Sequence, residues 1–193
     1  VRLGDQDAAR AIYESLLADR PDQPQLWQNL GHALKTLGRQ ADAVHAYRQA
    51  VHHRPTMGEA WWSLANLKTV TLDAADIATM EQALETLARD GQTEGEDVFH
   101  LHFSLGKAQE DRKADEAAFR HYDAGNRLRR AMIRHDAGEF SAEVAATAAT
   151  FSAPFIAAMG DGGCPAPDPI FIVGLPRAGS TLVEQILASH SQV

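Results

Sequence analysis

A spacing of 34 residues recurs through the first two-thirds of the chain and constrains its fold more than any other feature. The pairs with this separation include Ala9 and Ala43, Tyr13 and Tyr47, Pro21 and Pro55, Trp27 and Trp61, and Leu30 and Leu64. A fixed period of this size is typical of repeat architectures, in which each unit buries its apolar face only against its neighbours. The chain is therefore expected to begin as a stack of similar units.

One unit shows its type most clearly. Its marked positions are Trp27, Leu30, Gly31, Leu34, Ala43, Tyr47, Ala50 and Pro55. This order resembles the tetratricopeptide repeat, a pair of antiparallel helices, with Leu34 and Tyr47 in place of the usual Tyr and Phe. Small residues let the two helices approach closely, while Trp27 and Tyr47 are expected to fill the space between hairpins. The resemblance also implies an interaction module that binds a protein or an extended peptide.

The repeat array is expected over residues 1–135, with units near 1–21, 24–55, 58–89 and 97–134. The last unit is displaced, because Leu105–Gly106 lies 75 residues after Leu30–Gly31, which is two periods plus seven. The extra residues are assigned to the polar stretch Arg89–Glu96, where glycines favour a loop. The expected second helix of the third unit, Ala74–Arg89, lacks the Ala…Tyr pattern and is interpreted as degenerate.

A different pattern occupies the C-terminal end. The apolar run Ile170–Val173 predicts a buried strand, Gly174–Gly179 a turn, and the residues from Ser180 onward a helix. Strand, glycine-bounded loop and helix form the layout of a phosphate cradle, where main-chain N–H groups and the helix dipole favour an anion. The alternative is an ordinary helix start, since Gly and Ser or Thr also serve as turn and capping residues.

The side chains of this loop separate it from better-known phosphate loops. Gly174 and Gly179 have the spacing of a nucleoside-triphosphate P-loop and Thr181 falls on its Ser/Thr position, but Ser180 replaces its lysine. The cation is instead Arg177, inside the loop. ATP or GTP binding is therefore disfavoured, and a G-x-S-x-G hydrolase motif does not fit around Ser180.

The run Gly174-x-Pro176-Arg177-Ala178-Gly179-Ser180-Thr181-Leu182 resembles the 5′-phosphosulfate-binding loop of sulfotransferases. The variant is most similar to that of the tyrosylprotein sulfotransferases and their bacterial relatives fused to tetratricopeptide repeats. The resemblance implies transfer of a sulfuryl group from 3′-phosphoadenosine 5′-phosphosulfate to a hydroxyl acceptor, with protein tyrosine as a candidate and no metal.

The resemblance also assigns roles to residues of the loop. Arg177 would contact the phosphosulfate and offset the charge that develops on its bridging oxygen, as the catalytic cation. The cofactor-binding residues would be Arg177, Ala178, Gly179, Ser180 and Thr181. The general base and the residues for the 3′-phosphate are expected beyond Val193.

The expected fold class is mostly α: a tetratricopeptide-repeat solenoid followed by the first strand, P-loop and helix of an α/β sulfotransferase domain over 170–193. Connecting helices are expected over 141–159, with Ser141 capping the first and Pro154 starting the second, and a Gly/Pro-rich linker over 160–169. One strand and one helix cannot complete a parallel sheet. The sequence is therefore expected to be a fragment, cut at both ends and inactive alone.

Composition limits the remaining functions. A net charge of −8 argues against a nucleic-acid-binding surface. The single cysteine, Cys164, excludes an intramolecular disulfide and a four-cysteine zinc site, and the pairs His52–His53 and His100-x-His102 lack metal-ligand spacing. No apolar run approaches the ~18 residues of a membrane span and no signal peptide is visible, so the expected location is cytoplasmic.

Two groups of side chains have competing interpretations. Trp27 and Trp61 stand on the structural position of the repeat and are expected in the core, whereas Trp62 is the better candidate for an exposed contact. A basic cluster near the end of the last repeat helix is either a solvated helix terminus or a border of the phosphosulfate pocket. It consists of Arg127, Arg129, Arg130 and Arg134.

Three functions remain open from the sequence. The first is a repeat-fused sulfotransferase whose array recruits a protein partner or acceptor. The second is a tetratricopeptide interaction scaffold without catalytic activity, which also describes the fragment alone. The third is a nucleotide-binding P-loop protein, which Ser180 disfavours.

Overall fold

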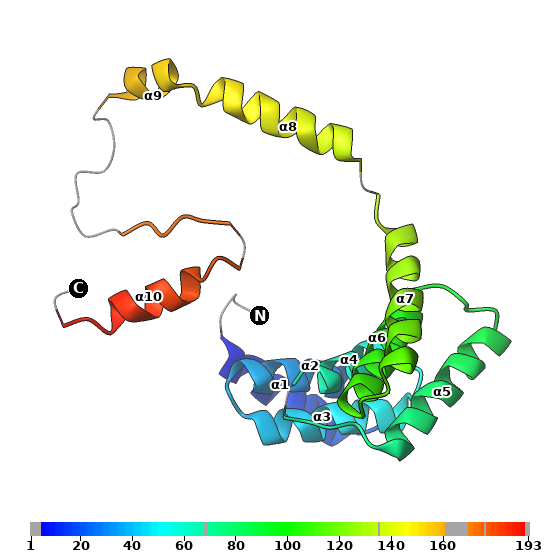
Figure 1. Ribbon diagram of the computed structural model, residues 1–193. Helices are drawn as coiled ribbons and strands as arrows, with labels where there is room; N and C mark the ends of the chain where they lie inside the picture. Colours follow the sequence, from blue (N-terminus) through cyan, green and yellow to red (C-terminus); the bar gives the residue numbers. More distant parts are fainter. Residues whose placement is uncertain (1–4, 68, 135, 161–169, 176, 192–193) are drawn as a thin grey trace. The chain divides into compact units, whose positions relative to one another are not determined.

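The computed structural model describes residues 5–67, 69–134, 136–160, 170–175 and 177–191. Regular structure within these ranges is entirely helical (Figure 1). In order the helices are α1 (Gln6–Asp19), α2 (Pro24–Thr36), α3 (Gln40–His53), α4 (Gly58–Ala65), α5 (Ala74–Arg89), α6 (Glu96–Asp111), α7 (Asp115–Met132), α8 (Ala137–Thr150), α9 (Ala153–Met159) and α10 (Ser180–Ala188). The chain divides into two units, Val1–His135 and Asp136–Val193.

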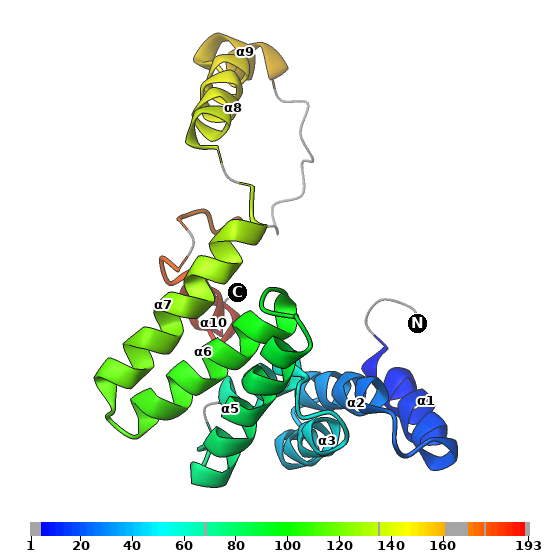
Figure 2. The same ribbon diagram turned by 90° about the vertical axis from the view of Figure 1, so that its right-hand side faces the viewer.

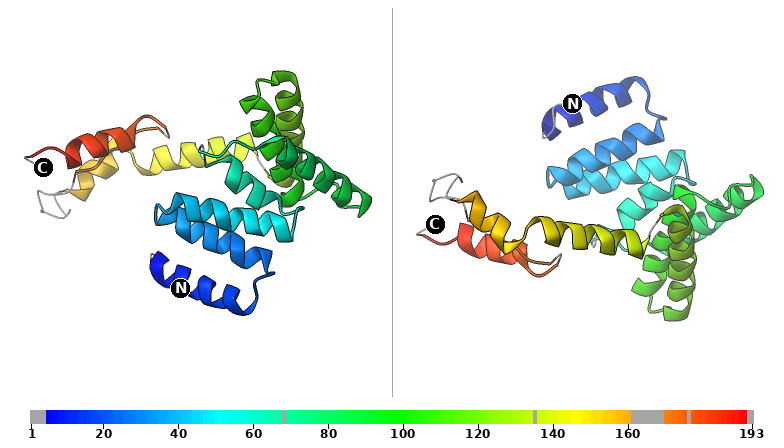
Figure 3. Two further views of the ribbon diagram at one scale, coloured as in Figure 1. Left: turned by 90° about the horizontal axis from the view of Figure 1, so that it is seen from below. Right: turned by 90° about the horizontal axis from the view of Figure 1, so that it is seen from above.

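The first unit is the repeat array, and its helices stack in chain order from α1 to α4 (Figures 2 and 3). Helices α2 and α3 form one hairpin and α6 and α7 another, while α1 packs on α2 and α3 packs on α4. The buried apolar side chains form one continuous cluster from Leu17 on α1 to Ala108 on α6. The helical solenoid expected from the 34-residue period is confirmed.

Both complete hairpins are closed by the same contact. Gly31 on α2 faces the ring of Tyr47 on α3, and a Cβ added at Gly31 would lie only 2.5 Å from that ring. Gly106 on α6 faces Tyr122 on α7 in the same way, with a Cβ-to-ring distance of 2.6 Å. The displaced last unit therefore repeats the packing of the α2–α3 unit, as its Leu-Gly and Ala…Tyr pattern predicts.

The junctions between hairpins also repeat. The indole Nε1 of Trp27 donates to the Pro21 carbonyl at 2.6 Å, and that of Trp61 donates to the Pro55 carbonyl at 2.9 Å. Both bonds span six residues and fix the chain as it enters the first helix of a unit. Trp62, expected as an exposed contact, is instead half-buried, with its ring centroid 5.8 Å from that of Phe103.

The third unit departs from a regular repeat. Helix α4 ends at Ala65 with Asn66 as its C-cap, much earlier than the corresponding helix α2. The side-chain amide of Gln40 on α3 donates to the Leu67 carbonyl at 3.1 Å and holds this early exit. Helix α4 packs against α6, and α5 packs against α6 on another side, so the expected α4–α5 hairpin is replaced by an α4–α6 pair.

Long-range polar contacts secure this irregular unit. Asp76 on α5 accepts two hydrogen bonds from the guanidinium of Arg48 on α3, one of them at 2.9 Å, and also closes the capping box with Asp73 at the start of α5. Asp97 on α6 accepts a hydrogen bond from the Gly58 N–H at 2.9 Å and thereby caps the start of α4. Helix α6 thus satisfies a main-chain donor of α4 as well as packing against it.

The second unit contains α8, α9 and α10. Helix α8 begins at Ala137, earlier than the expected start at Ser141, because Asp136 accepts from the Gly138 and Glu139 N–H groups and serves as N-cap. Helix α9 begins at Ala153 with Ser152 as N-cap and a proline in its first turn, close to the expected start. Most of the expected linker lies outside the described residues, as does Cys164.

The expected strand over residues 170–173 is wrong for the part of the chain described here. These four residues belong to no strand and are exposed. A strand requires a neighbouring strand to accept its main-chain hydrogen bonds, and the described ranges offer none. The helix predicted to follow the loop is present as α10, and it starts at Ser180 as expected.

No single helix in the described ranges is long and apolar enough to cross a membrane. Helices α8 and α9 pass that test only when taken together, and they are bent by 48° at their junction.

Candidate functional site

The phosphate-loop candidate is built at the start of α10. A turn closes where the Ala178 N–H donates to the Leu175 carbonyl at 3.1 Å, and it places Arg177 at its third position. Arg177 has a φ of +64° and Gly179 a φ of +89°, so both occupy the left-handed region. Glycine tolerates this conformation, but an arginine that adopts it is uncommon and indicates a constrained site.

The main-chain N–H groups at the start of α10 are suited to binding an anion. Gly179 precedes α10 as its N-cap and, having no side chain, offers no side-chain acceptor to the first turn. The opening N–H groups of an α-helix have no acceptor within the helix, and they carry the positive end of its dipole. Successive main-chain N–H groups in a turn that contains left-handed residues also form concave sites that bind anions.

The predicted site residues occupy this short segment together. Ser180 and Thr181 are the first two residues of α10, where hydroxyl and main-chain donors lie side by side. The side chains of Arg177, Ser180 and Thr181 are all exposed, so a large anion has free access to them. No atom of the described residues lies within 4 Å of the position that a Cβ at Gly179 would occupy. The donor set therefore fits a phosphate or sulfate group.

Three residues of the basic cluster, Arg127, Arg129 and Arg130, lie on α7 in the first unit, and Arg134 follows the end of this helix. Arg129 places its guanidinium carbon 5.3 Å from the centre of the Phe99 ring, and Arg127 pairs with Asp123 one turn earlier. Arg129 and Arg130 are exposed in the last turn of α7, where cations complement the helix dipole. A role for this cluster beside the phosphosulfate stays a prediction.

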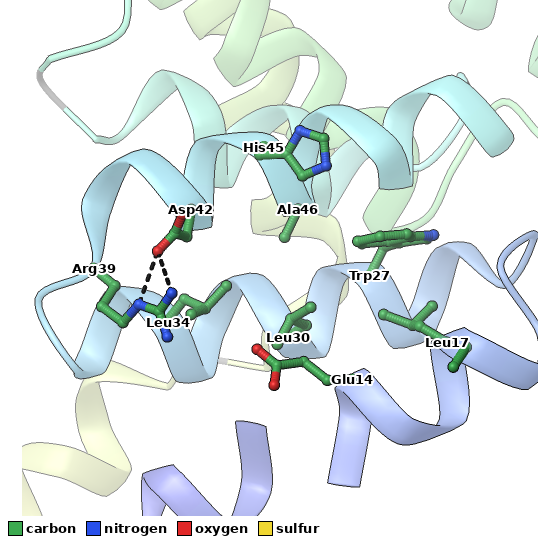
Figure 4. Close-up of a pocket in the computed structure, with 10 residues that line it drawn as sticks. Glu14, Leu17, Trp27, Leu30, Leu34, Arg39, Asp42, His45 and Ala46 are labelled. Atoms are coloured by element: carbon green, nitrogen blue, oxygen red, sulfur yellow. Dashed lines mark hydrogen bonds and ion pairs between the residues drawn. The ribbon is translucent and has the colours of Figure 1, made fainter. Parts of the chain in front are cut away.

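A second candidate site is a groove in the repeat array, between α1, α2 and α3 (Figure 4). Its cavity volume is about 360 Å³. The apolar lining comes from Leu17, Ala18, Trp27, Leu30, Leu34 and Ala46, and the polar lining from Glu14, Arg39, Asp42 and His45. Apolar floor and charged rim together suit a protein segment with one apolar anchor.

Polar side chains at the rim of this groove are held in place by contacts with neighbouring residues. The guanidinium of Arg39 donates to Asp42 from Nε at 2.8 Å, and its second nitrogen lies 2.7 Å from the same oxygen (Figure 4). The ring of His45 stands edge-on to Trp27 with centroids 6.0 Å apart. Sequence analysis missed the polar residues of this groove, Glu14, Arg39, Asp42 and His45, since none stands at a defining position of the repeat.

Histidines connect the helices of the array through two separate contacts. The hydroxyl of Tyr47 lies 2.9 Å from Nδ1 of His32, and burial raises the pKa of Tyr47 to about 12. On α6 and α7, the Nδ1 atoms of His102 and His121 lie 3.1 Å apart. Burial lowers the pKa of both rings, and their mutual repulsion lowers that of His102 further.

These histidines do not assemble a metal centre with other ligands. Within the described ranges, no group of three or more His, Cys, Asp or Glu side chains has the arrangement needed to hold a metal ion. The His102–His121 contact is a hydrogen-bonded pair, in which one neutral ring donates to the other. The sequence alone does not predict this pair. His102 faces the helix that carries Ala118 and Tyr122, and its contact with His121 follows only from the register of that hairpin.

Comparison with known proteins gives two family matches. Residues 169–193 match the model described as "Sulfotransferase family", and residues 24–52 match the model described as "Tetratricopeptide repeat". The first match covers the phosphate loop and α10, and the second covers α2 and most of α3.

A protein of Aquifex aeolicus, described as an uncharacterized protein, is 31% identical over 166 residues. The match covers 86% of this chain but only 21% of that protein. The chain thus spans about a fifth of the relative that it matches. The chain therefore contains a segment similar to the tetratricopeptide repeat and, at residues 169–193, a segment similar to the sulfotransferase family.

Proposed function

We propose that this chain is part of an enzyme that transfers a sulfuryl group from 3′-phosphoadenosine 5′-phosphosulfate to a hydroxyl acceptor. The observation that carries the proposal is the start of α10, where the helix has no side-chain cap and follows Arg177 and Gly179 in left-handed conformations. The sulfotransferase-family match over 169–193 contains this loop and supports the identity of its ligand.

The chain's own residues supply charge and hydrogen bonds to this reaction. Sulfuryl transfer breaks the bond between sulfur and the bridging oxygen of the donor, forms a bond from sulfur to the acceptor oxygen, and passes the hydroxyl proton to a base. Arg177 offsets the negative charge that the bridging oxygen gains. The first-turn N–H groups of α10 and the hydroxyls of Ser180 and Thr181 hold the 5′-phosphate.

The loop chemistry also decides between donors. A nucleoside-triphosphate site needs a lysine next to Thr181 for the terminal phosphates, and Ser180 stands there instead. Calorimetric titration of the full-length protein with 3′-phosphoadenosine 5′-phosphate and with ATP tests this difference. The proposal expects binding of the first ligand at least tenfold tighter, and equal or tighter binding of ATP would overturn it.

Arg177→Ala tests the catalytic assignment. Loss of one preorganised charge-stabilising donor typically lowers kcat by on the order of 10²–10³. Arg120→Ala is the matched control, because it removes an exposed arginine that pairs with Glu116 on α7 and lies outside the basic cluster. Near-normal turnover in Arg177→Ala, with the control also unchanged, would contradict the assignment.

The repeat array is proposed to recruit a protein partner, which includes an acceptor protein with an accessible hydroxyl such as tyrosine. Tetratricopeptide repeats generally mediate protein interactions, and the groove between α1 and α3 offers an apolar floor with a charged rim. Double reversal of rim charges by Glu14→Lys and Arg39→Glu is expected to weaken partner binding at least tenfold without changing donor affinity. An unchanged partner affinity would exclude the groove.

A scaffold without catalysis is the second candidate function. The buried core of the described residues lies within the repeat array and includes no residue of α10. A full-length protein that binds its partner through the array but binds neither the donor nor 3′-phosphoadenosine 5′-phosphate would favour this function over the enzyme.

A further inference from the structure

Helices α8 and α9 display a continuous apolar stripe that nothing in their own unit covers among the described residues. Phe140, Val144 and Phe151 recur at helical spacing along α8 and are 63%, 52% and 60% exposed. Together with Thr147, Ala148 and the carboxylate Glu143 they line a shallow groove along the helix. The stripe is thus a shaped surface rather than a set of scattered apolar residues.

The stripe continues across the bend into α9. The rings of Phe151 and Phe155 stand edge to face with centroids 5.8 Å apart, so they join the apolar faces of the two helices. Ile156 and Met159 extend the surface and are 60% and 65% exposed. Contiguous apolar surface of this kind marks an interface, because a single folded chain seldom leaves it in water.

The charge of the two helices narrows the choice of partner. Between Ala137 and Met159 the ionisable side chains are the carboxylates Glu139 and Glu143, and no lysine or arginine occurs. Helices that lie on membranes combine their apolar face with basic residues that attract anionic lipid. Because α8 and α9 carry carboxylates and no basic residue, they lack this attraction to anionic lipid. A protein surface is therefore favoured as the partner that covers the stripe.

The same unit contains a second set of uncovered apolar side chains. Leu182 and Ile186 lie on one face of α10 and are 66% and 58% exposed, and Phe171 and Val173 before the loop are 86% and 90% exposed. All belong to the sulfotransferase-family segment over 169–193, which falls in the same unit as α8 and α9. That segment therefore supplies apolar surface to match the stripe.

We propose that the stripe formed by Phe140, Val144, Phe151, Phe155 and Ile156 is the docking surface for the sulfotransferase-family domain of the same chain. The proposal rests on the proposed function in one respect, that residues 169–193 belong to such a domain. The stripe then holds the phosphate loop at a fixed place beside the helices that follow the repeat array. The matching relative has ample length for a domain of this size, because the aligned stretch is only 21% of it.

Hydrogen–deuterium exchange on the full-length protein tests this assignment directly. Amides of α8 and α9 are expected to exchange at least tenfold more slowly than in a chain that ends at residue 159. The measurement is made at two protein concentrations, with and without vesicles of neutral and anionic phospholipid. Slow exchange that is independent of concentration and of vesicles supports docking within the chain.

Variants make the test specific to the stripe. Phe140→Asp and Val144→Asp place charge on the stripe, while Ala142→Asp and Ala149→Asp place the same charge on the opposite face of α8. The stripe variants are expected to speed exchange in α8 and α10 at least tenfold, and the control variants to leave both unchanged. Protection that grows with concentration would assign the stripe to a second copy, and protection only with vesicles would assign it to a membrane; either result overturns the proposal.

The outcome is separable from that of the proposed function. Exchange is measured without donor or acceptor, so a protected stripe in a protein that does not bind 3′-phosphoadenosine 5′-phosphate would refute the enzyme and retain the docking. Donor binding together with rapid exchange throughout α8 and α9 would support the enzyme and refute the docking.

Discussion

The ring of Tyr47 lies directly over Gly31, and this contact sets how closely α2 and α3 approach. A Cβ at Gly31 would meet three atoms of the ring within 3 Å, so no side chain fits between the helices. The hydroxyl of the same tyrosine reaches Nδ1 of His32, the next residue along α2. One aromatic residue thus fixes both the spacing and the register of the hairpin.

Gly31→Ala is expected to destabilise the array by about 1–3 kcal/mol, because the tyrosine ring must leave its position although alanine favours the helix. Gly106→Ala should have a similar effect through Tyr122. Urea unfolding followed by circular dichroism measures both. Gly138→Ala, in α8 and outside the array, is the control, and an equal loss of stability there would contradict the packing explanation.

Asp97→Ala is expected to cost about 0.5–2 kcal/mol, since it removes the side-chain acceptor for the Gly58 N–H at the start of α4. Exchange of the first amides of α4 should accelerate more than that of α2. Glu94→Ala removes an exposed carboxylate from the neighbouring loop and should leave both the unfolding free energy and the exchange unchanged. A uniform effect on α2 and α4 would argue against a local cap.

Stability is expected to fall as pH decreases below about 6.5. Burial lowers the pKa of His102 and His121 in the folded chain, so the unfolded chain binds more protons between the folded and unfolded pKa values. The contribution is complete above the unfolded pKa and is lost as pH falls toward the folded values. Nearby Glu81 opposes this shift at His121, and Arg120 adds to it.

His121→Gln should flatten the dependence of unfolding free energy on pH between about pH 5 and 7, because it removes one of the two coupled protonation sites. Thermal or urea unfolding over this range measures the slope. His53→Gln, at the exposed end of α3, is the control. An unaltered slope in His121→Gln would show that the pair does not govern acid sensitivity.

Gly179→Ala is expected to weaken binding of 3′-phosphoadenosine 5′-phosphate by roughly tenfold, since a φ of +89° costs an L-residue about 1–2 kcal/mol. Gly174→Ala is a close control at the other end of the same loop, where a Cβ would make an ordinary 3.6 Å contact with Ala178. Calorimetric titration of the full-length variants distinguishes them. Equal losses at both positions would mean that the left-handed turn is not required for the ligand.

Much of the array follows from local sequence pattern. The 34-residue period places Trp27 and Trp61 on equivalent hydrogen bonds, and the Leu-Gly and Ala…Tyr positions place Gly106 against Tyr122 despite the seven-residue displacement. These residues act within one hairpin or at one junction. Their effect therefore depends on contacts near in sequence, which a pattern records.

The features that escaped prediction depend on distant partners. The early end of α4 relies on Gln40 from the previous unit, and the α4–α6 pair relies on Asp97, which is 39 residues from Gly58. The start of α10 was predictable, because glycine before Ser180 acts locally. The strand expected over 170–173 required pairing with residues far along the chain, which no local pattern supplies.

The packing of α4 against α6, in place of an α4–α5 hairpin, limits how this array can change in length. A unit bounded by the Pro21–Trp27 and Pro55–Trp61 bonds has the same junction at both ends, so gene duplication of these 34 residues would preserve both junctions. Removing residues 58–89 would instead leave α6 without the helix whose start it caps and whose side it covers. Evolutionary gain of units is therefore expected on the N-terminal side of α4, with α4 to α7 inherited as one block.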